Sequence, residues 1–326
     1  MSVAPVLEVK GLRIEFPTRR GTLVAVDDVS FSIAPGEVLG VVGESGAGKS
    51  LTGTAIIGLL EPPGRIAAGE VLLEGERIDR LDHDRMRRIR GKRIGAIFQD
   101  PLTSLNPLYT IGEQLVETIR THLEVDAAGA RARAVALLQE VGIPAPEARI
   151  DNYPHQFSGG MRQRVVIALA LCAEPRLIIA DEPTTALDVS IQAQIIQLLK
   201  RLASVHGTAV MLITHDMGVI AETADRVAVM YAGRIAEIGP VRGVIRDAHH
   251  PYTVGLMGSI PKLGAGAGKH RAPLAQIEGA MPRLNAMPAG CAFHPRCDRC
   301  LERCKTERPE PHRVGANLTA CWLYDE

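Results

Sequence analysis

No segment of this 326-residue sequence is apolar over the length that a membrane-spanning helix needs. The longest uninterrupted apolar run is Val165–Ala173, whereas a span takes roughly 20 residues. The first residues, Met1–Lys10, lack a basic region followed by an apolar stretch, so they do not show the pattern of a signal peptide. We therefore expect a chain that is not exported and that reaches a membrane only through partner proteins.

An excess of charge of either sign is also absent. The 37 Lys and Arg residues balance 37 Asp and Glu residues, so the formal net charge is zero. One dense basic stretch, Arg85–Arg93, directly follows Asp79, Asp82 and Asp84. This balance favours a solvated helix face over a nucleic-acid-binding patch. We expect no nucleic-acid partner.

The hydrophobic patterns predict an α/β fold. A short alternating pattern over Val6–Ile33 predicts antiparallel strands, and the compact apolar run Glu37–Val42 predicts a buried strand. Further along, strand and helix patterns alternate, which predicts right-handed crossovers and a mainly parallel sheet. The alternating segments are 177–180, 191–202, 209–213, 219–223 and 227–231.

Two other regions differ from this alternation of strands and helices. Apolar residues recur at helical spacing between Pro101 and Ala173, which predicts a helical insert. Gly264–Gly268 has the composition of a flexible linker or loop. We therefore predict a main domain over residues 1–245, with a helical subdomain at about 101–173, and a C-terminal extension over residues 246–326.

The glycine-rich segment after the predicted strand Glu37–Val42 carries the first chemical motif. It fits G-x-x-x-x-G-K-[ST], between a strand and a helix that begins near Lys49. Glycines let backbone N–H groups face phosphate oxygens, Lys49 neutralises β/γ-phosphate charge, and the Ser50 hydroxyl ligates Mg²⁺. The predicted nucleotide contacts are Gly43, Glu44, Ser45, Gly46, Ala47, Gly48, Lys49, Ser50 and Leu51.

Two carboxylates follow the predicted buried strand 177–180. Ligands of parallel sheets bind at the carboxyl ends of strands, where Asp181 and Glu182 stand. Asp181 suits the shell of Mg²⁺, and Glu182 suits the orientation and deprotonation of the attacking water. Alone, this pattern is also that of a plain strand end. Beside a phosphate-binding loop it predicts a catalytic site.

The octet Phe157–Arg164 stands just before the apolar run Val165–Ala173. Ser158 can cap that helix, while Gly159 and Gly160 leave its first N–H groups bare. The octet therefore predicts a second phosphate-reading helix terminus. A simple helix cap is the alternative.

Together these segments resemble the nucleotide-binding subunit of an ABC transporter. Its signature is usually Leu-Ser-Gly-Gly-Gln, and here Phe157 and Met161 occupy the first and last positions. The resemblance implies a P-loop NTPase fold with a RecA-like core, an antiparallel β subdomain and a helical subdomain. It also implies that two nucleotides bind between two head-to-tail domains. Ser158, Gly159 and Gly160 would then contact the ATP of a partner.

The resemblance assigns roles to four further residues. Gln99 matches the loop glutamine that touches Mg²⁺ and water, and Asp188 matches the loop that crosses to the partner domain. His215 matches the histidine that contacts the γ-phosphate. The predicted catalytic set is thus Lys49, Gln99, Glu182 and His215, with Ser50, Gln99 and Asp181 on Mg²⁺. Phe16 matches the aromatic that stacks on adenine, although a strand aromatic is as often part of a core.

More extended segments resemble the ATPases of peptide and nickel importers. They are Phe98–Pro107, Asp181–Gln194, His250–Thr253 and Gly290–Cys297. The resemblance implies an ATPase that powers di- or oligopeptide import, with nickel or another small solute as the alternative. It implies a peripheral position on the cytoplasmic face of the inner membrane. The implied partners are a second ATPase subunit, two permease subunits and an extracytoplasmic solute-binding protein, and Met161 favours a heterodimer of ATPases.

A different class of function is a soluble ABC-type ATPase that acts on nucleic acid or ribosomes. Its architecture needs two nucleotide domains in one chain or long coiled-coil insertions, and the sequence shows neither. A third hypothesis is a regulatory module in which the cysteine-rich tail senses metal or redox state.

Cysteine is scarce except near the C-terminus, where five of the six cysteines fall between Cys291 and Cys321. In a chain that is not exported, this crowding indicates a metal or cluster site rather than disulfides. By resemblance, Cys291, Cys297, Cys304 and Cys321 are placed to hold a [4Fe–4S] cluster. Four thiolates also suit Zn²⁺, because Cys300 adds a Cys-x-x-Cys pair with Cys297, and unligated reduced thiols are the third alternative.

Overall fold

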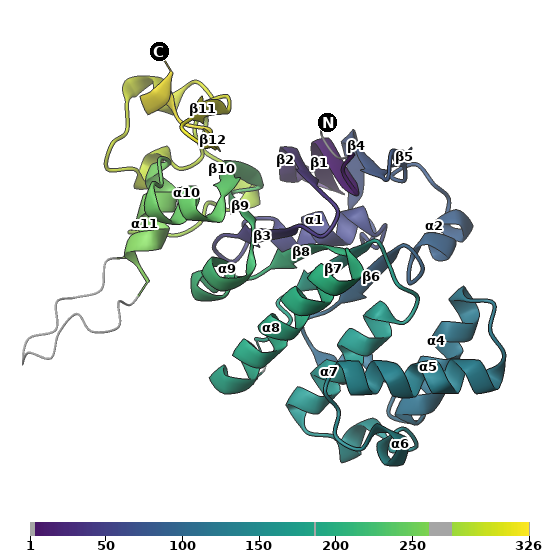
Figure 1. The fold of residues 1–326 in the computed structure, drawn as a ribbon. Coiled ribbons are helices and arrows are strands. Elements are labelled where there is room, and N and C mark those ends of the chain that lie inside the picture. The colour runs from purple at the N-terminus through teal and green to yellow at the C-terminus, as the bar shows by residue number, and fades with distance from the viewer. Residues whose placement is uncertain (1–3, 186, 261–275, 326) are drawn as a thin grey trace, which may run out of the picture.

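The structure is a computed structural model, which describes residues 4–185, 187–260 and 276–325. Two β-sheets and the helices packed against them make up the main body, and the C-terminal extension lies beside one edge of the larger sheet (Figure 1). The predicted linker Gly264–Gly268 lies outside the described residues. Within the part of the chain that is described, no helix has both the length and the apolar content for crossing a bilayer.

The larger sheet places the phosphate-binding loop at its centre. Its strands are β3 (Val38–Val42), β6 (Ile94–Ile97), β7 (Leu177–Asp181), β8 (Ala209–Ile213), β9 (Arg226–Tyr231), β10 (Arg234–Pro240), β11 (His312–Val314) and β12 (Asn317–Thr319). Their order is β11-β12-β10-β9-β3-β8-β7-β6. The strands from β9 to β6 pair in parallel, and the pairs on the other side of β9 are antiparallel. The predicted, mainly parallel sheet is confirmed.

The smaller sheet is antiparallel, as the alternating pattern of the first residues predicts. Its strands are β1 (Leu7–Thr18), β2 (Gly21–Ile33), β4 (Arg65–Leu73) and β5 (Glu76–Arg77), in the order β2-β1-β4-β5. β1 and β2 form a hairpin in which Leu7 pairs with Ile33 and Thr18 pairs with Gly21. Leu12 and Ile14 of β1 are fully buried, because alternate residues of a strand point to the same face.

Helices occupy the segments between the strands. The α-helices are α1 (Lys49–Ile56), α2 (His83–Ile89), α3 (Pro101–Ser104), α4 (Ile111–His122), α5 (Ala127–Glu140), α6 (Pro146–Arg149), α7 (Gly159–Leu171), α8 (Val189–His206), α9 (Met217–Thr223), α10 (Val241–Arg246) and α11 (Pro251–Gly258). Short 3₁₀ turns are found at Pro154–Gln156, Leu284–Ala286, His294–Arg296, Glu302–Lys305 and Trp322–Tyr324. The predicted helical insert therefore contains α3 to α7. In α2, the arginines at 85, 87 and 88 are exposed, which fits the predicted solvated helix face.

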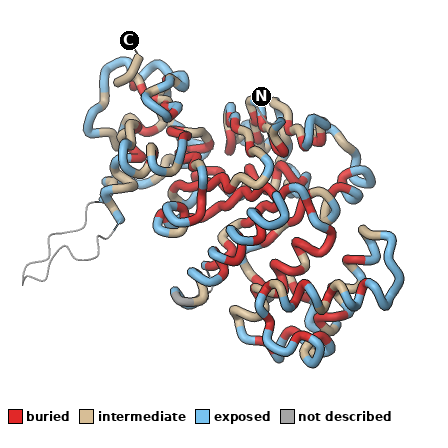
Figure 2. Tube along the Cα trace, in the orientation of Figure 1, coloured by how far each residue is buried: buried red, intermediate tan, exposed pale blue. Residues whose placement is uncertain are grey.

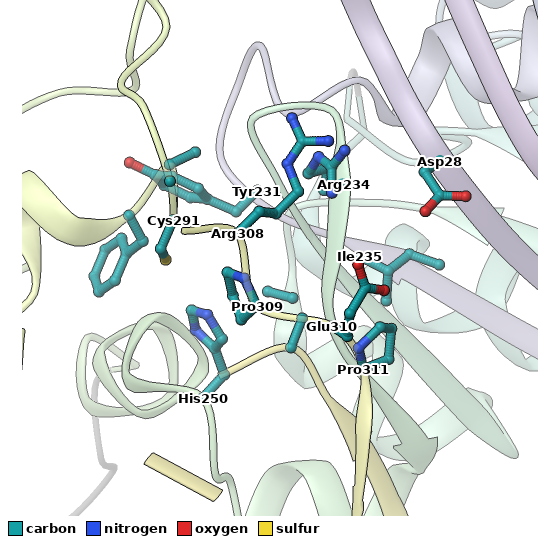
Figure 3. Close-up of a pocket in the computed structure, with 15 residues that line it drawn as sticks. Asp28, Tyr231, Arg234, Ile235, His250, Cys291, Arg308, Pro309, Glu310 and Pro311 are labelled. Carbon is teal, nitrogen blue, oxygen red and sulfur yellow. The ribbon is translucent and has the colours of Figure 1, made fainter. Parts of the chain in front are cut away.

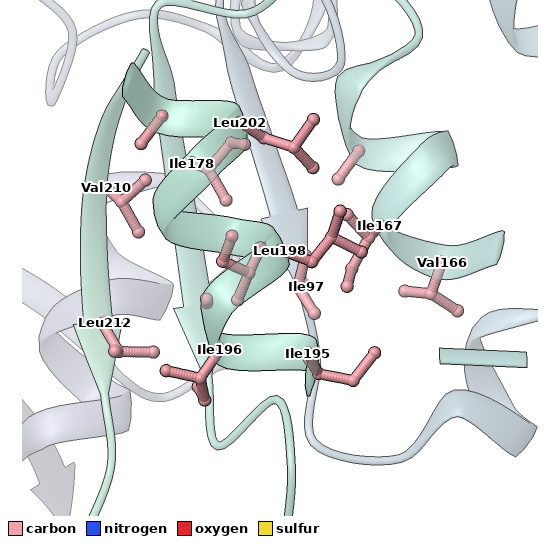
Figure 4. Packing of buried hydrophobic residues seen from close by; sticks show 14 of the residues in the cluster. Ile97, Val166, Ile167, Ile178, Ile195, Ile196, Leu198, Leu202, Val210 and Leu212 are labelled. Carbon is pink, nitrogen blue, oxygen red and sulfur yellow. The ribbon is translucent and has the colours of Figure 1, made fainter. Parts of the chain in front are cut away.

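The core around α8 shows why the helix forms where it does. Ile195, Leu198, Leu199 and Leu202 recur at helical spacing, so one face of α8 is apolar. That face packs on Ile178 of β7, on Val210 and Leu212 of β8, and on Ile167 of α7 (Figure 4). Complete burial of one such side chain stabilises a fold by roughly 1.5–3 kcal/mol. The buried residues concentrate along the larger sheet and its covering helices (Figure 2).

The C-terminal extension joins the larger sheet instead of hanging free from it. β12 pairs with β10, so Glu237 lies opposite Thr319 and the hairpin β11–β12 continues the sheet. The fully buried carboxylate of Glu237 accepts hydrogen bonds from the side chain of Asn317 and from the backbone N–H groups of His249 and His250. The division at residues 245 and 246 stays a prediction, and it falls within α10.

Candidate active site

A groove lies at the carboxyl ends of the parallel strands, and all four of the predicted catalytic residues line it. Its volume is about 1180 Å³, which is large enough for a nucleotide. From the main body it is lined by Leu23, Ala25, Ser45, Gly46, Ala47, Gly48, Lys49, Ser50, Leu51, Gln99, Glu182 and His215. The parallel topology explains this convergence: the segments after β3, β6, β7 and β8 all emerge at one edge of the sheet.

The loop between β3 and α1 has the backbone shape that only glycine permits. Gly43 has φ 150°, and a Cβ atom there would lie 2.2 Å from the carbonyl oxygen of Met230. Gly48, the residue before α1, has φ 98°. The N–H of Ala47 donates to the carbonyl of Glu44 over 3.2 Å, which closes the turn. The loop therefore leads from a buried strand directly into a helix N-terminus, where anions bind.

Lys49 lies against the loop that precedes it. Its side chain is buried, and Nζ donates to the carbonyl oxygens of Gly43 over 2.8 Å and Glu44 over 3.0 Å. Burial lowers the pKa of Lys49, and the charges of Glu182, Asp181 and Glu44 oppose that change. An ammonium group has three donors, so one remains for a phosphate oxygen.

Ser50 lines the groove and contacts Asp181, a predicted Mg²⁺ ligand that is not part of the groove lining. Ser50 Oγ donates to Asp181 Oδ1 over 3.0 Å, which joins the start of α1 to the end of β7. Burial raises the pKa of Asp181, the hydrogen bond from Ser50 opposes the change, and the neighbouring Glu182 adds to it. A hydroxyl beside a carboxylate is an oxygen donor set that suits Mg²⁺. The residues present therefore fit the ion that the motif implies.

Glu182 is the centre of a hydrogen-bonded group of side chains. Gln99 Nε2 donates to its Oε2 over 3.2 Å, Thr185 Oγ1 donates to the same atom over 2.8 Å, and His215 Nδ1 lies 3.1 Å from Oε1. Burial acts to raise the pKa of Glu182, but the hydrogen bonds from Thr185 and His215 outweigh it, so the pKa is lowered. Glu182 also has a φ of 46°, in the left-handed region that non-glycine residues rarely adopt. The site thus holds an ionised carboxylate in a fixed direction.

Several predicted contacts do not line this groove. Ser158 Oγ accepts the N–H of Met161 over 3.4 Å and caps α7, as predicted, but Ser158, Gly159 and Gly160 lie outside the groove. The same holds for Asp188, which precedes α8. Gly160 also has a packing role, because a Cβ atom there would lie 2.8 Å from Cγ2 of Ile191.

Phe16, the predicted adenine-stacking residue, is likewise absent from the groove lining. It pairs across the hairpin with Leu23, and its ring packs against Gly64, where a Cβ atom would lie 2.7 Å from Cε1 of Phe16. Leu23 and Ala25 of β2 line the groove in its place. Gly43 and Glu44 also stay out of the lining, although the loop that they begin forms the groove floor.

Two features of the site have no counterpart in the sequence prediction. Thr185 holds Glu182, yet a lone threonine after a strand carries no motif. The other side of the groove is formed by Met281, Pro282, Arg283, Leu284 and Asn285 of the C-terminal extension. The 3₁₀ turn at Leu284–Ala286 contacts β2. No spacing rule identifies this segment, because its apolar and polar residues follow no motif.

The extension meets the main body around a small cavity. Tyr231, Arg234, His250, Cys291 and Arg308 are among the residues that line it (Figure 3). Arg308 forms an ion pair of 3.0 Å with Asp27 of β2, and Phe293 stacks edge-on against Tyr231. The extension therefore contacts both sheets.

The tail cysteines are neighbours, but they do not form a ready metal site. The N–H of Cys291 donates to the carbonyl of Cys304 over 2.9 Å. Burial raises the pKa values of Cys291 and Cys297 to about 11, and nearby thiols add to the shift. Among the described residues, no group of three or more His, Cys, Asp or Glu side chains is placed to hold a metal ion. The predicted [4Fe–4S] or Zn²⁺ site gains no support from this arrangement.

The fold and the groove together define the class of the protein. The features seen here are those of an ABC-type P-loop ATPase. They are a phosphate loop after a central parallel strand, carboxylates at the end of β7, His215 after β8 and an accompanying antiparallel sheet. Solved structures agree: the dimeric bacterial ABC transporter cassette MJ0796 matches with a TM-score of 0.65 and 31% identity, over 73% of this chain and 99% of the other. The cassette cbiO1 from Clostridium perfringens, part of the transporter complex cbiONQ, matches with a TM-score of 0.63 and 28% identity over 75% and 94%.

Sequence comparisons identify the family within that class. Residues 26–185 match the ABC transporter family, and residues 236–304 match the oligopeptide/dipeptide transporter C-terminal region. The dipeptide transport ATP-binding protein DppD of Bacillus subtilis is 47% identical over 98% of this chain and 95% of its own length. OppD, the oligopeptide transport ATP-binding protein of the same organism, is 48% identical over 98% and 89%. DppD of Haemophilus influenzae is 44% identical over 97% and 94%.

The chain therefore belongs to the ABC transporter ATP-binding proteins of the dipeptide and oligopeptide import family. It is the ATPase subunit of such a transporter, and its activity, ATP hydrolysis coupled to transport, uses ATP with Mg²⁺. The predicted family, fold class and enzymatic activity are confirmed.

Proposed function

We propose that this chain powers the import of dipeptides or oligopeptides from the cytoplasmic face of the inner membrane. The observation that carries the proposal is the convergence of Lys49, Ser50, Glu182 and His215 on one groove, with Asp181 bonded to Ser50, in a chain that carries a peptide-transporter type of extension. Its partners are two permease subunits, an extracytoplasmic solute-binding protein and a second ATPase subunit. The chain has no nucleic-acid partner.

Each residue of the groove has a role that follows from its position. Lys49 binds the β- and γ-phosphates, which replace part of its bonding to the loop carbonyls. Ser50, Asp181 and Gln99 hold Mg²⁺, which supplies charge neutralisation at the phosphates when bound. Glu182 orients the attacking water and accepts its proton, and His215 contacts the γ-phosphate. Because the protein does little covalent chemistry in phosphoryl transfer, the fixed direction of Glu182 and its ability to accept a proton are both needed.

The residues outside the groove belong to the nucleotide of a second subunit. Ser158, Gly159 and Gly160 stand at the N-terminus of α7, where backbone N–H groups face outward for a phosphate. Asp188 lies in the exposed segment before α8 and contacts the same partner subunit. Met161 in place of the usual glutamine supports a pair of unlike ATPase subunits. Phe16 remains our candidate for contact with adenine, beside Leu23.

Transport by the assembled complex tests this proposal. The complex of two permease and two ATPase subunits is placed in liposomes, with the solute-binding protein outside and ATP enclosed on the side of the ATPases. These liposomes should take up a labelled dipeptide or oligopeptide. Glu182→Gln should stop uptake and leave assembly unchanged. Uptake of nickel without any uptake of peptides would replace the proposed solute and keep the ATPase role.

For the tail we propose that Cys291, Cys297, Cys304 and Cys321 bind a [4Fe–4S] cluster, with Zn²⁺ as the alternative. The crowding of these cysteines in the C-terminal sequence is what supports the proposal. Iron, sulfide and zinc analysis of anaerobically purified protein, with Cys172→Ser as the control, separates the two. Protein that contains neither iron nor zinc would contradict the proposal.

A further inference from the structure

The phosphate-binding loop is held by the C-terminal extension as well as by the strand and helix that flank it. Its second residue, Glu44, does not face the groove. The carboxylate points to the extension instead, where Nη1 of Arg296 lies 3.1 Å from both carboxylate oxygens. These residues are separated by 252 positions in the sequence.

Arg296 is built into a rigid pocket. Only 7% of its side chain is exposed. Its other donors reach backbone carbonyls, at 2.8 Å to Glu278 and 3.3 Å to Ile277, and the guanidinium lies 5.8 Å from the ring centre of Tyr231. A buried cation is stable only when it is paired and hydrogen-bonded. Glu44 supplies the carboxylate, so the direction of Glu44 is fixed by the extension.

A second contact holds the backbone of the same residue. The N–H of Glu44 donates to the hydroxyl of Tyr252 over 2.9 Å. Tyr252 is fully buried on α11, and its ring packs 4.6 Å from Tyr231 and 5.5 Å from Phe293, measured between ring centres. This N–H is therefore directed into the protein and away from the groove, which leaves the phosphate contacts to later residues of the loop.

The carbonyl group of Glu44 connects these contacts with the extension to the catalytic lysine, Lys49. Its carbonyl oxygen accepts from Lys49 Nζ over 3.0 Å and from the N–H of Ala47 over 3.2 Å. The side chain and N–H of Glu44 are thus fixed by the extension, and its carbonyl positions Lys49 and the turn of the loop. A shift of Glu44 would move the donors that face the phosphates.

We infer that Arg296 is a positioning residue for ATP binding, and that it acts through Glu44 with Tyr252 as its support. The inference rests on the proposed nucleotide site. It predicts that loss of the pair weakens the binding of Mg-ATP and raises the KM for ATP. The effect on kcat should be smaller, because Glu182, Gln99 and His215 are not part of this attachment.

A double-mutant cycle tests the inference. Mg-ATP affinity is measured by equilibrium dialysis on the full chain for Arg296→Ala, Glu44→Gln and the combination of both, and ATPase kinetics are measured on the assembled complex. We expect each single change to weaken binding about tenfold, or about 1.4 kcal/mol. The double variant should lose no more than the worse single one, since two residues in direct contact share one interaction.

Control variants separate positioning from a loss of structure. Arg303→Ala removes an arginine of the extension that pairs with Glu307 and Asp325, remote from the loop, and should bind Mg-ATP as the unaltered chain does. Glu44→Gln keeps a hydrogen-bond acceptor beside Arg296 and leaves its backbone carbonyl contacts intact, and thermal unfolding checks that the extension stays folded in that variant. Tyr252→Phe keeps the packed ring and should weaken binding less than Arg296→Ala. Arg296→Lys should restore only part of the affinity, because lysine cannot donate from a planar fork.

Two outcomes would overturn the inference: unchanged Mg-ATP affinity in folded Arg296→Ala and Glu44→Gln, or fully additive losses in the double variant. Failure of the proposed function looks different, since the unaltered chain would then bind no Mg-ATP or the complex would take up no peptide. A shift of the KM for ATP in Arg296→Ala would stand even if the transported solute were not a peptide.

Discussion

The two sides of the groove are built in different ways. The side formed by the main body consists of groups with fixed chemistry: the ammonium of Lys49, the hydroxyl of Ser50 and the carboxylate of Glu182. The opposite side is the segment Met281–Asn285, which mainly supplies shape and apolar surface. Phosphate and Mg²⁺ demand particular donors and acceptors, whereas a base and a sugar can be enclosed by many different residues. The first side is therefore expected to control turnover and phosphate binding, and the second to make a smaller contribution to affinity only.

The largest effect should come from the catalytic carboxylate. Glu182→Gln removes the proton acceptor and keeps the shape of the side chain, so ATP turnover of the assembled complex should fall by about 10²–10⁴-fold. Mg-ATP binding by equilibrium dialysis should persist. Glu222→Gln, at an exposed position on α9, is the matched control. Near-normal phosphate release by Glu182→Gln would remove Glu182 from the catalytic role.

Acid should loosen the extension before it neutralises Glu182. Burial lowers the pKa of His250 to about 4, while an unfolded histidine titrates near 6.5. The unfolded chain therefore binds a proton that the folded chain excludes, and stability falls as the pH drops from 6.5 to 4, by up to about 3 kcal/mol. Of the groups of His250, only the backbone N–H donates to the buried carboxylate of Glu237.

Thermal unfolding at pH 7 and pH 4.5 measures this effect. His250→Asn retains an N-cap acceptor for the N–H of Tyr252 and should lose part of the pH dependence. His83→Asn, at an exposed position, should keep all of it. Equal pH dependence in both variants would contradict the assignment to His250.

Lys49→Ala should weaken Mg-ATP binding by about 10- to 100-fold, because charge-assisted hydrogen bonds contribute about 1.5–3 kcal/mol. Equilibrium dialysis measures the loss. Lys200→Ala provides the control, because Lys200 is exposed and, among the described residues, its Nζ donates only to the carbonyl oxygen of Glu222. If Lys49→Ala takes up Mg-ATP normally, the loop does not bind the phosphates.

The smallest effect is expected on the apolar side. Leu284→Ala removes apolar surface from the groove and should raise the KM for ATP about fivefold, since the loss is about 1 kcal/mol. Turnover at saturation should stay the same. Leu301→Ala changes an equally exposed leucine of the extension that lies outside the groove. A fall in kcat equal to the rise in KM would show that the two sides are not separable.

The features that the sequence predicts, and those that it does not, divide in the same way between the two sides of the groove. The strand pattern and the motif G-x-x-x-x-G-K-[ST] place Lys49 at the start of the helix that follows β3, because both period and residue type are constrained there. Thr185 escapes prediction, since any hydroxyl in reach of Glu182 could hold it. The segment Met281–Asn285 escapes as well, because its position depends on how β12 pairs with β10. Phe16 packs against Gly64 and is not part of the groove lining, and its contact with adenine stays a prediction.

The pairing of β12 with β10 also bears on aggregation. A strand at the border of a sheet exposes unpaired N–H and C=O groups that can recruit another chain. The hairpin covers that row on β10 and replaces it with β11, which is only three residues long. A chain cut at residue 245 would expose the edge of β10 and favour self-association. Loss of the extension is therefore expected to lower solubility, which would mask any effect on ATP binding.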